Sequence, residues 1–295
     1  MVLEEVAECP VCSGVNFVPH LVCTDFTATH EAFPVKHCTS CGVGITSPRP
    51  TEINSGRYYE SEKYISHTAS SRGLFDSIYF FMRSFTTRWK YSLVKPYLKE
   101  GGLLDYGCGT GAFLREVKKH GHVVYGVEPS IEARKSVGNL APTVATIKDL
   151  PATSFDVITL WHVLEHVYDL SATIQQLRAR LTENGVLFIA VPNHESHDAM
   201  YYGKYWAAYD VPRHIWHFTK SSMAVFLQKE GLSLIETIPM KLDAFYVSLL
   251  SEQYRSTGPS GVRGILRATR RGLISNFKGR TKTNQSSLIF VVKKK

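Results

Sequence analysis

The chain has 295 residues, of which 44% are hydrophobic and 20% are charged, an ordinary composition for a protein with a substantial core. No apolar run approaches the ~20 residues that span a bilayer, and no leader resembling a signal peptide precedes Cys9, so we expect a cytoplasmic protein. The net charge of +8 is local, because the segment from Gln253 to Lys295 holds eleven Lys and Arg and no Asp or Glu. Such a segment can meet nucleic acid, anionic lipid or water alone.

Two close pairs of cysteines near the start of the chain predict a metal site. Cys9 and Cys12 form one C-x-x-C pair, Cys38 and Cys41 form the other, and a glycine follows each pair shortly afterwards. Tight turns of this kind let four thiolates converge on one tetrahedral zinc ion, whose binding supplies folding energy. We therefore expect a structural zinc ribbon over residues 1–50. Disulfides are the weaker alternative in a cytosolic protein.

Residues 51–100 are expected to form a helical linker. Thr46–Pro50 leads into it as an extended exit, because its two prolines disfavour helix. Tyr58, Tyr59 and Tyr64 then follow, either as a packed aromatic linker or as a lid over a ligand. From Leu74 to Leu98, apolar and aromatic residues recur every three or four positions, which predicts a helix whose stripe packs as core.

A glycine-rich stretch, Leu103 to Leu114, reads LLDYGCGTGAFL and predicts a strand, a tight turn and a helix from Ala112. Glycine lets the backbone adopt positive φ and approach a nucleotide-like ligand at the carboxyl end of the first strand of a doubly wound sheet. The stretch also satisfies the loose dinucleotide pattern, with Glu128 at a suitable distance for a ribose, so a nicotinamide cofactor is an alternative. Asp105 argues against it, since a carboxylate repels a pyrophosphate and suits a ligand that carries an ammonium group.

This stretch strongly resembles motif I of the class I S-adenosylmethionine-dependent methyltransferases. The resemblance implies that Asp105, Gly107 and Gly109 lie around the methionine part of the cofactor and that Glu128 accepts both ribose hydroxyls. The full set of expected cofactor-binding residues is Asp105, Gly107, Cys108, Gly109, Gly111, Glu128, Pro129, Asp149, Leu150 and His162. Asp149 can also merely begin a turn, because relatives commonly place the acidic residue three positions earlier, where this chain has Thr146.

From residue 101 the chain alternates strands with helices, which predicts an α/β fold. We expect a Rossmann-like, doubly wound, seven-stranded, mostly parallel sheet whose last strand is antiparallel. This cofactor-binding domain covers residues 101–295, with insertions at 193–218 and 239–286. After the first strand, the expected strands are Val123–Val127, Val144–Ile147, Phe155–Leu160, Gly185–Val191, Leu232–Ile238 and Ser287–Val292.

The segment Trp161–Val167 resembles the HVLEHV signature of a methyltransferase branch that includes O-methyltransferases of quinone biosynthesis and several sugar methyltransferases. It follows a central strand, where the transferred methyl group should emerge. His162 is expected to line the cofactor and is a second catalytic candidate. Glu165 and His166 would not share a face if the segment is helical. A general base, a divalent metal ligand and a structural helix start all remain open for this pair.

The insertion at 193–218 is rich in aromatic and titratable residues, as functional surface loops often are. Its second half resembles the DxPRHxxHF segment of the same family. Methyl transfer needs a positioned nucleophile and a group that removes its proton, and imidazole has a suitable pKa. His214 is therefore the expected base, with Asp210 or Arg213 orienting it or the acceptor. A scaffold role for His217 is at least as well supported as a catalytic one.

In the insertion at 239–286, Phe245, Leu249 and Leu250 predict one helix. Residues 258–282 form a basic segment with an apolar stripe, and we favour packing of that stripe on the domain. The alternative is peripheral contact with an anionic membrane. Aromatic and basic residues do not interleave there as in nucleic-acid binders, and no pattern reports on the oligomeric state.

Together these features predict methyl transfer from S-adenosylmethionine to an oxygen, nitrogen or carbon of a small molecule, sugar or lipid-linked intermediate. The alternatives are an RNA methyltransferase that uses the ribbon and the basic segment, and a non-catalytic zinc-containing binding protein.

Overall fold

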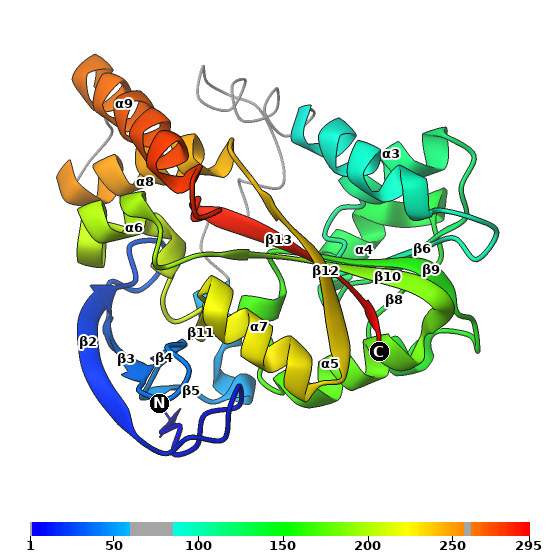
Figure 1. The fold of residues 1–295 in the computed structure, drawn as a ribbon, viewed down its shortest axis with the longest axis horizontal. Coiled ribbons are helices and arrows are strands. Elements are labelled where there is room, and N and C mark those ends of the chain that lie inside the picture. Colours follow the sequence, from blue (N-terminus) through cyan, green and yellow to red (C-terminus); the bar gives the residue numbers. More distant parts are fainter. Residues whose placement is uncertain (1, 60–84, 257–260) are drawn as a thin grey trace.

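A computed structural model describes residues 2–59, 85–256 and 261–295 (Figure 1). Its centre is a seven-stranded sheet in the order β12-β13-β10-β9-β6-β7-β8. In chain order its strands are β6 (Leu103–Tyr106), β7 (Val124–Val127), β8 (Thr143–Val144), β9 (Phe155–Trp161), β10 (Leu181–Pro192), β12 (Leu232–Pro239) and β13 (Ser287–Lys294). Only β13 runs antiparallel to its neighbours in this sheet. The predicted fold class is therefore confirmed.

One strand is shorter than expected. The third strand, β8, ends at Val144, whereas the prediction extended it to Ile147. The reason is local, because Thr146 and Asp149 form a reciprocal capping box that starts the 3-10 turn η5 (Ile147–Asp149).

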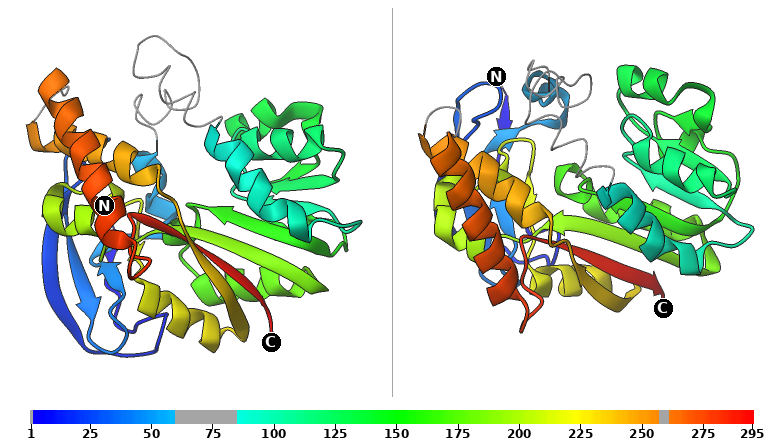
Figure 2. Two further views of the ribbon diagram at one scale, coloured as in Figure 1. Left: turned by 45° about the horizontal axis from the view of Figure 1, so that its top comes forward. Right: turned by 90° about the horizontal axis from the view of Figure 1, so that it is seen from above.

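Helices cover both faces of the sheet (Figure 2). Successive strand residues point to opposite faces, so Leu103 and Val157 pack in one apolar cluster while Leu104 and Ile158 pack in the other. The first cluster includes α3 (Ala112–Lys119), α4 (Ile131–Val137) and the helix at residues 85–94. The second includes α5 (Leu170–Ala179) and α7 (Lys220–Lys229). Helices α4, α5 and α7 begin after the side-chain caps Ser130, Asp169 and Thr219.

The described part of the 51–100 linker contains two short 3-10 turns, η1 (Glu52–Asn54) and η2 (Gly56–Tyr58), the helix at 85–94 and the turn η3 (Lys95–Tyr97). Tyr58 is buried, as the packed-linker interpretation expects. Phe85 belongs to the stripe of the predicted 74–98 helix that was expected to pack as core, but it is 58% exposed. Tyr64 and the first part of the predicted 74–98 helix lie outside the described residues.

The N-terminal residues form a second sheet that takes one strand from the 193–218 insertion. Its order is β11-β4-β3-β2, with β2 (Phe17–Thr24), β3 (Ala32–Cys38), β4 (Gly44–Thr46) and β11 (Trp216–His217). A separate short pair joins β1 (Leu3–Glu4) to β5 (Arg49–Pro50). Strand β11 pairs with β4 along Trp216↔Ile45 and His217↔Gly44. Two segments far apart in sequence therefore build one sheet (Figure 1).

The 193–218 insertion is folded and packed, so its expectation as a surface loop was wrong. It contains α6 (His197–Tyr202), the 3-10 turns η7 (Gly203–Tyr205) and η8 (Ala207–Tyr209), and strand β11. Its rings at Tyr202, Trp206 and Tyr209 are at most 4% exposed and share an apolar cluster with Phe33 of β3. Most of its aromatic content is thus core, which the composition alone did not distinguish from a binding loop.

The 239–286 insertion forms two packed helices, α8 (Asp243–Ser256) and α9 (Val262–Gly279). The helix predicted from Phe245, Leu249 and Leu250 is confirmed as α8. The favoured packing of α9 was wrong, since its buried residues are the small ones and most of its large apolar side chains are exposed. Within the described ranges, no helix combines the length and hydropathy that crossing a membrane requires.

Candidate functional site

The glycine-rich loop between β6 and α3 has an open side on which a ligand can lie. Gly107, Gly109 and Gly111 have φ of +75°, +54° and +75°, values that strain other residues. A Cβ atom at Gly107 would lie 2.5 Å from Val163 Cγ2, so the loop packs closely against the segment after β9. A Cβ atom at Gly109 would meet nothing within 4 Å. The loop is therefore closed toward the protein and open at Gly109.

Glu128 follows strand β7 and faces this loop. Its Oε2 atom accepts a hydrogen bond from the Gly109 N–H, and its Oε1 atom accepts one from the Ser130 N–H, both at 2.9 Å. Each carboxylate oxygen keeps further acceptor capacity. The fixed carboxylate thus fits a pair of ribose hydroxyls, as the motif resemblance predicts.

Asp105, near the end of β6, is 3% exposed and accepts a hydrogen bond from the Thr159 hydroxyl at 2.7 Å. Burial raises the pKa of its carboxyl to about 7, although the Thr159 bond opposes this rise. A bound ammonium group would favour the ionised form, so Asp105 fits the methionine end of S-adenosylmethionine. Sequence reasoning missed Thr159, because nothing in its own strand marks it as a partner of β6.

Asp149 is engaged in its own turn. Its Oδ2 atom accepts hydrogen bonds from the Thr146 N–H at 3.2 Å and from the Thr146 hydroxyl at 3.0 Å. This is the turn role that the sequence left open. Contact of Asp149 or of buried Leu150 with a cofactor stays a prediction, as it does for Cys108 and Pro129.

His162 lies between two carboxylates immediately after β9, with a left-handed backbone at φ +57°. Its Nε2 atom is 3.0 Å from Asp243 Oδ2, and its Nδ1 atom is 3.3 Å from Glu165 Oε1. Burial lowers the pKa of His162, but the bonds to Asp243 and Glu165 outweigh burial and raise it to about 9. An imidazolium that donates both N–H groups cannot accept a proton. This arrangement therefore does not suit His162 as a catalytic base.

Sequence reasoning missed Asp243, which begins α8 in a region without a recognisable motif. A pocket of about 380 Å³ lies beside it, at the carboxyl end of the sheet. Its lining residues are Phe85, Thr86, Trp89, Ile238, Pro239, Met240, Lys241, Leu242 and Asp243. A mostly apolar pocket with one carboxylate suits a small organic acceptor.

Glu165, His166 and His214 come together, because the segment forms a single 3-10 turn and not the α-helix in which Glu165 and His166 would not share a face. They lie on the 3-10 turn η6 (Leu164–His166) and on the segment before β11, and one ligand atom from each falls within 4.8 Å of the others. The two segments are tied by the Ile215 N–H, which donates to the Glu165 carbonyl at 2.9 Å. The side chain of Glu165 is fully buried, and its Oε2 atom has no hydrogen-bond partner within the described residues.

Both imidazoles in this cluster are oriented by backbone carbonyls. His214 Nδ1 lies 2.8 Å from the Ala208 carbonyl, and His166 Nδ1 lies 3.0 Å from the Arg213 carbonyl. A carbonyl only accepts, so His214 Nδ1 carries the hydrogen and His214 Nε2 keeps its lone pair in the neutral ring. His166 Nδ1 also lies 3.2 Å from the Tyr59 hydroxyl, which can donate or accept. Burial, helped by the charge of His214, lowers the pKa of His166 to about 4, so this ring is neutral at physiological pH. The cluster can therefore accept a proton or coordinate a divalent cation.

Among the described residues, the side chains of Asp210 and Arg213 bond to each other and not to the His214 ring, and a role toward the acceptor stays a prediction. The Arg213 guanidinium is fully buried and donates to Asp210 Oδ2 and to Asp25 Oδ1, both at 2.9 Å. It also donates to the Tyr58 carbonyl at 2.9 Å. Burial opposes ionisation of Asp210, but the charge of Arg213 outweighs it and lowers the Asp210 pKa. Asp25, Asp210 and Arg213 form a buried triad that joins the insertion to the N-terminal segment.

His217 has the scaffold position that the sequence allowed. It is 4% exposed, and its Nε2 atom lies 2.9 Å from the Thr46 hydroxyl. That hydroxyl also lies 2.9 Å from the His214 carbonyl and donates to it, which links β4 to the backbone of His214.

The four predicted zinc ligands converge, and none of them forms a disulfide. The Sγ atoms of Cys9 and Cys41 are 3.6 Å apart, those of Cys12 and Cys38 are 3.5 Å apart, and all four fall within 4.8 Å of one another. A tetrahedral site with Zn–S bonds of about 2.3 Å has sulfur atoms about 3.8 Å apart. The cluster thus has the dimensions of a four-thiolate zinc site.

Comparison with known proteins decides the family. A family model described as a methyltransferase domain matches residues 60–237, more than half of the chain. The chain belongs to the class I S-adenosylmethionine-dependent methyltransferases. A ubiquinone biosynthesis O-methyltransferase of Pelagibacter ubique (strain HTCC1062) is 30% identical over 188 residues, which cover 58% of this chain and 75% of that protein.

Other members of the methyltransferase family match over shorter stretches or in fold alone. The ubiquinone biosynthesis O-methyltransferase of Histophilus somni (strain 2336) is 33% identical over 111 residues, 32% of this chain and 47% of that protein. This methyltransferase therefore spans about half the length of that relative. The magnesium protoporphyrin IX methyltransferase of Synechocystis PCC 6803, solved with bound SAH, is 14% identical with a TM-score of 0.53. That alignment covers 83% of this chain and all of the other, and it shows a shared fold.

Proposed function

We propose that this methyltransferase transfers the methyl group of S-adenosylmethionine to a small-molecule acceptor at the carboxyl end of the central sheet. Asp105, Gly109 and Glu128 would hold the cofactor, which supplies the methyl group when bound. The observation that carries the proposal is the glycine loop, which has open space at Gly109 and lies next to the carboxylates of Asp105 and Glu128. The comparisons give no support to the RNA and non-catalytic alternatives.

O-methylation is the favoured reaction, and sugars and lipid-linked intermediates remain within the acceptor class. The relatives are O-methyltransferases by name, and a hydroxyl acceptor must lose its proton as it attacks. His214 Nε2 would take this proton, because its Nδ1–H is held by the Ala208 carbonyl. The acceptor oxygen forms the new bond to the methyl carbon while the bond from that carbon to sulfur breaks. The apolar pocket beside Asp243 would hold the acceptor.

The Cys9, Cys12, Cys38 and Cys41 cluster would hold one structural zinc ion. With four protein ligands no open coordination position would remain, so the ion would take no direct part in the transfer. Its contribution would be to fix β4 and, through Thr46, the backbone at His214.

Calorimetric titration with S-adenosylmethionine, and separately with NAD, tests the cofactor assignment. We expect saturable binding of the former alone, and a large loss of affinity in Asp105→Ala and Glu128→Gln. Glu183→Gln is the matched control, because Glu183 is exposed and away from the loop. Binding of NAD alone, or unchanged affinity in both loop variants, would overturn the proposal.

A further inference from the structure

Helix α9 packs on the protein through its small residues. Its buried positions are Gly264, Ala268, Gly272, Ser275 and Gly279. A Cβ atom at Gly272 would lie 2.6 Å from the Phe245 ring of α8, so the two helices approach too closely for a larger side chain. Two arginines of α9 add contacts to its neighbours: Arg267 pairs with Glu252 of α8 at 3.0 Å, and the Arg271 Cζ atom lies 3.6 Å from the centre of the Tyr201 ring of α6. The orientation of α9 is therefore fixed by close packing.

Four large apolar side chains of α9 lie on the opposite side of the helix. Val262, Leu266, Leu273 and Phe277 are 74%, 64%, 58% and 72% exposed. At 3.6 residues per turn these four positions fall within an arc of about 60°. They form one apolar ridge, which a packed core helix would have turned inward.

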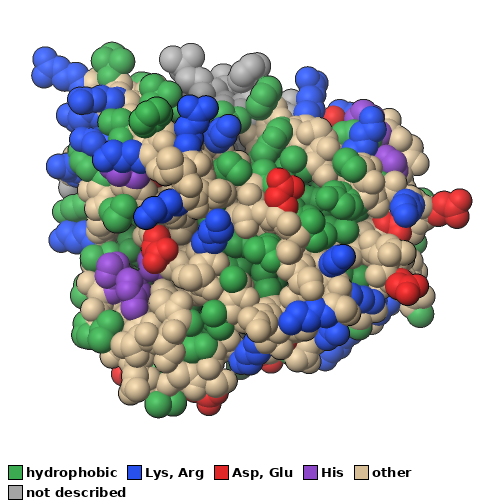
Figure 3. All heavy atoms as spheres, viewed as in Figure 1, with side chains coloured by type: hydrophobic (Ala, Val, Ile, Leu, Met, Phe, Trp, Pro, Cys, Tyr) green, Lys and Arg blue, Asp and Glu red, His purple; other side chains and the backbone are tan. Residues whose placement is uncertain are grey.

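Basic side chains flank this ridge along one side. Arg263, Arg270 and Lys278 are exposed, and α9 contains no acidic residue. Figure 3 shows Lys and Arg side chains gathered over α9, with hydrophobic side chains between them. A ridge of apolar side chains beside a row of cations matches the boundary of an anionic bilayer, where acyl chains lie next to phosphates.

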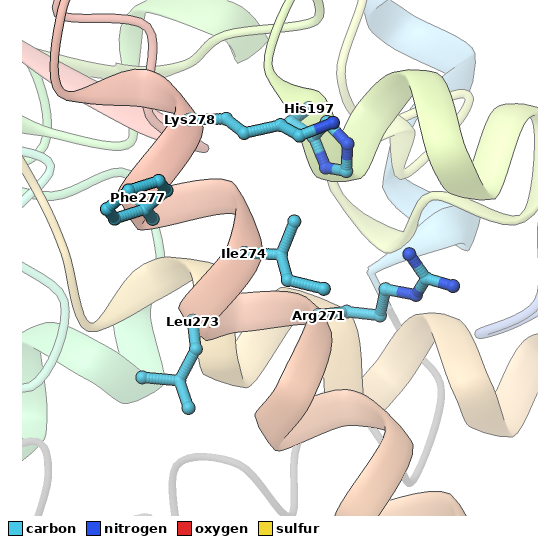
Figure 4. Close-up of a pocket in the computed structure, with 6 residues that line it drawn as sticks. All are labelled: His197, Arg271, Leu273, Ile274, Phe277 and Lys278. Carbon is cyan, nitrogen blue, oxygen red and sulfur yellow. The ribbon is translucent and has the colours of Figure 1, made fainter.

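The same face contains a hollow of about 470 Å³ that suits a lipid headgroup. It is lined by His197, Arg271, Leu273, Ile274, Phe277 and Lys278. In Figure 4 Lys278 reaches toward His197 of α6, whereas Phe277 and Leu273 point away from them. The nearby charges of Lys278 and Arg271 help to lower the pKa of His197, after the larger effect of burial. Two cations thus border a hollow whose rim carries the apolar ridge.

We propose that α9 lies flat on an anionic lipid bilayer, with Val262, Leu266, Leu273 and Phe277 among the acyl chains and the flanking cations on lipid phosphates. A second copy of this chain that docked through its own α9 fits the face poorly, because that helix has no acidic residue to pair with the cations. Nucleic acid would satisfy the cations but would leave the apolar ridge in water. This inference rests on the geometry of α9 and does not depend on the acceptor or on catalysis.

Flotation of the full chain with phosphatidylcholine vesicles, with and without phosphatidylglycerol, tests the proposal. We expect binding only to the anionic vesicles, and weaker binding as salt is raised. Leu273→Ser with Phe277→Ser should reduce partitioning by about tenfold or more, because two large apolar side chains leave the bilayer. Arg263→Glu with Arg270→Glu should abolish the preference for anionic lipid.

Matched controls separate this surface from general effects. Ile53→Ser removes a 96% exposed apolar side chain elsewhere, and Lys95→Glu with Lys119→Glu reverses two exposed charges elsewhere; both should bind vesicles like the unaltered protein. All variants should keep their unfolding midpoints and their affinity for S-adenosylmethionine. The proposal is overturned if the unaltered protein ignores anionic vesicles, or if the Leu273 and Phe277 double variant binds them equally well. A dimer that dissociates in that variant, without vesicle binding, would assign the face to a second copy.

Discussion

Arg213 donates a hydrogen bond to Asp25 at 2.9 Å, and both side chains are fully buried. Asp25 follows β2 and Arg213 precedes β11, which are the two edge strands of the N-terminal sheet. Removing one partner of a buried ion pair leaves the other charge without compensation, which costs about 3–5 kcal/mol. Arg213→Met should therefore lower the free energy of unfolding by about that amount. Lys119→Met, which breaks an i,i+3 ion pair with Glu116 whose lysine is 62% exposed, should cost less than about 1 kcal/mol. Urea unfolding measures both, and similar losses in the two variants would contradict the structural role of the buried triad.

The proposed base makes a separate kinetic prediction. His214→Asn keeps a donor for the Ala208 carbonyl but removes the free Nε2 lone pair. Once an acceptor is known, we expect kcat to fall by about 10²–10⁴-fold while the affinity for S-adenosylmethionine stays unchanged. His194→Asn, at a buried histidine outside the cluster, is the control for general disturbance.

A chelator distinguishes the two chemistries open to the Glu165, His166 and His214 cluster. With a base at His214, activity should survive chelation of divalent cations under conditions that leave the proposed zinc site at the cysteine cluster undisturbed. Loss of activity that added Mg²⁺ or Mn²⁺ restores would instead assign the cluster to a metal ion.

Asp105 predicts how cofactor affinity varies with pH. In the free protein the pKa of its carboxyl is about 7, so below pH 7 a bound ammonium group meets a neutral partner. The dissociation constant for S-adenosylmethionine should therefore fall about tenfold between pH 6 and pH 8. Because the folded pKa lies above the ordinary value of 3.8, the same carboxyl stabilises the fold at low pH and less so as pH rises through 7. Asp105→Asn should remove both dependences, and an unchanged pH profile in this variant would exclude Asp105 as their source.

The cysteine cluster predicts one bound zinc ion per chain. Cys38→Ser should release that ion and lower the thermal midpoint, because the folding energy supplied by the metal is lost. Cys23→Ala is the control, since Cys23 is buried outside the cluster and should keep the metal. Elemental analysis and thermal unfolding check both variants; full zinc occupancy in Cys38→Ser would refute the assignment.

Local patterns were enough to predict the central sheet and several helix starts. The alternation of strands and helices, the cap at Ser130 and the start of α3 at Ala112 depend on residues close in sequence. The partners that complete the site were not accessible in this way. Asp243, for example, is 81 residues from His162, and no feature of either segment announces their pairing.

The error at α9 has a different physical origin. Hydrophobic periodicity identifies which residues share a face, and it grouped the four ridge residues correctly. It also grouped Ile265 and Ile274 with them, and these two are less exposed. It does not say which face is buried, because a row of small residues can pack closely enough to turn the larger side chains outward. The sequence feature that indicated the buried face is the small residue at every fourth position, at Gly264, Ala268 and Gly272.

The pairing of β11 with β4 means that the N-terminal segment is not a detachable appendage of the enzyme. A chain that began at residue 51 would strip Trp216 and His217 of their neighbouring strand and leave Arg213 without Asp25. The Thr46 hydroxyl that fixes the His214 carbonyl would be lost with them. With zinc at the cysteine cluster, as proposed, zinc supply would bear on catalysis: cells starved of the metal should hold a folded cofactor site in which His214, the proposed proton acceptor, has lost its alignment.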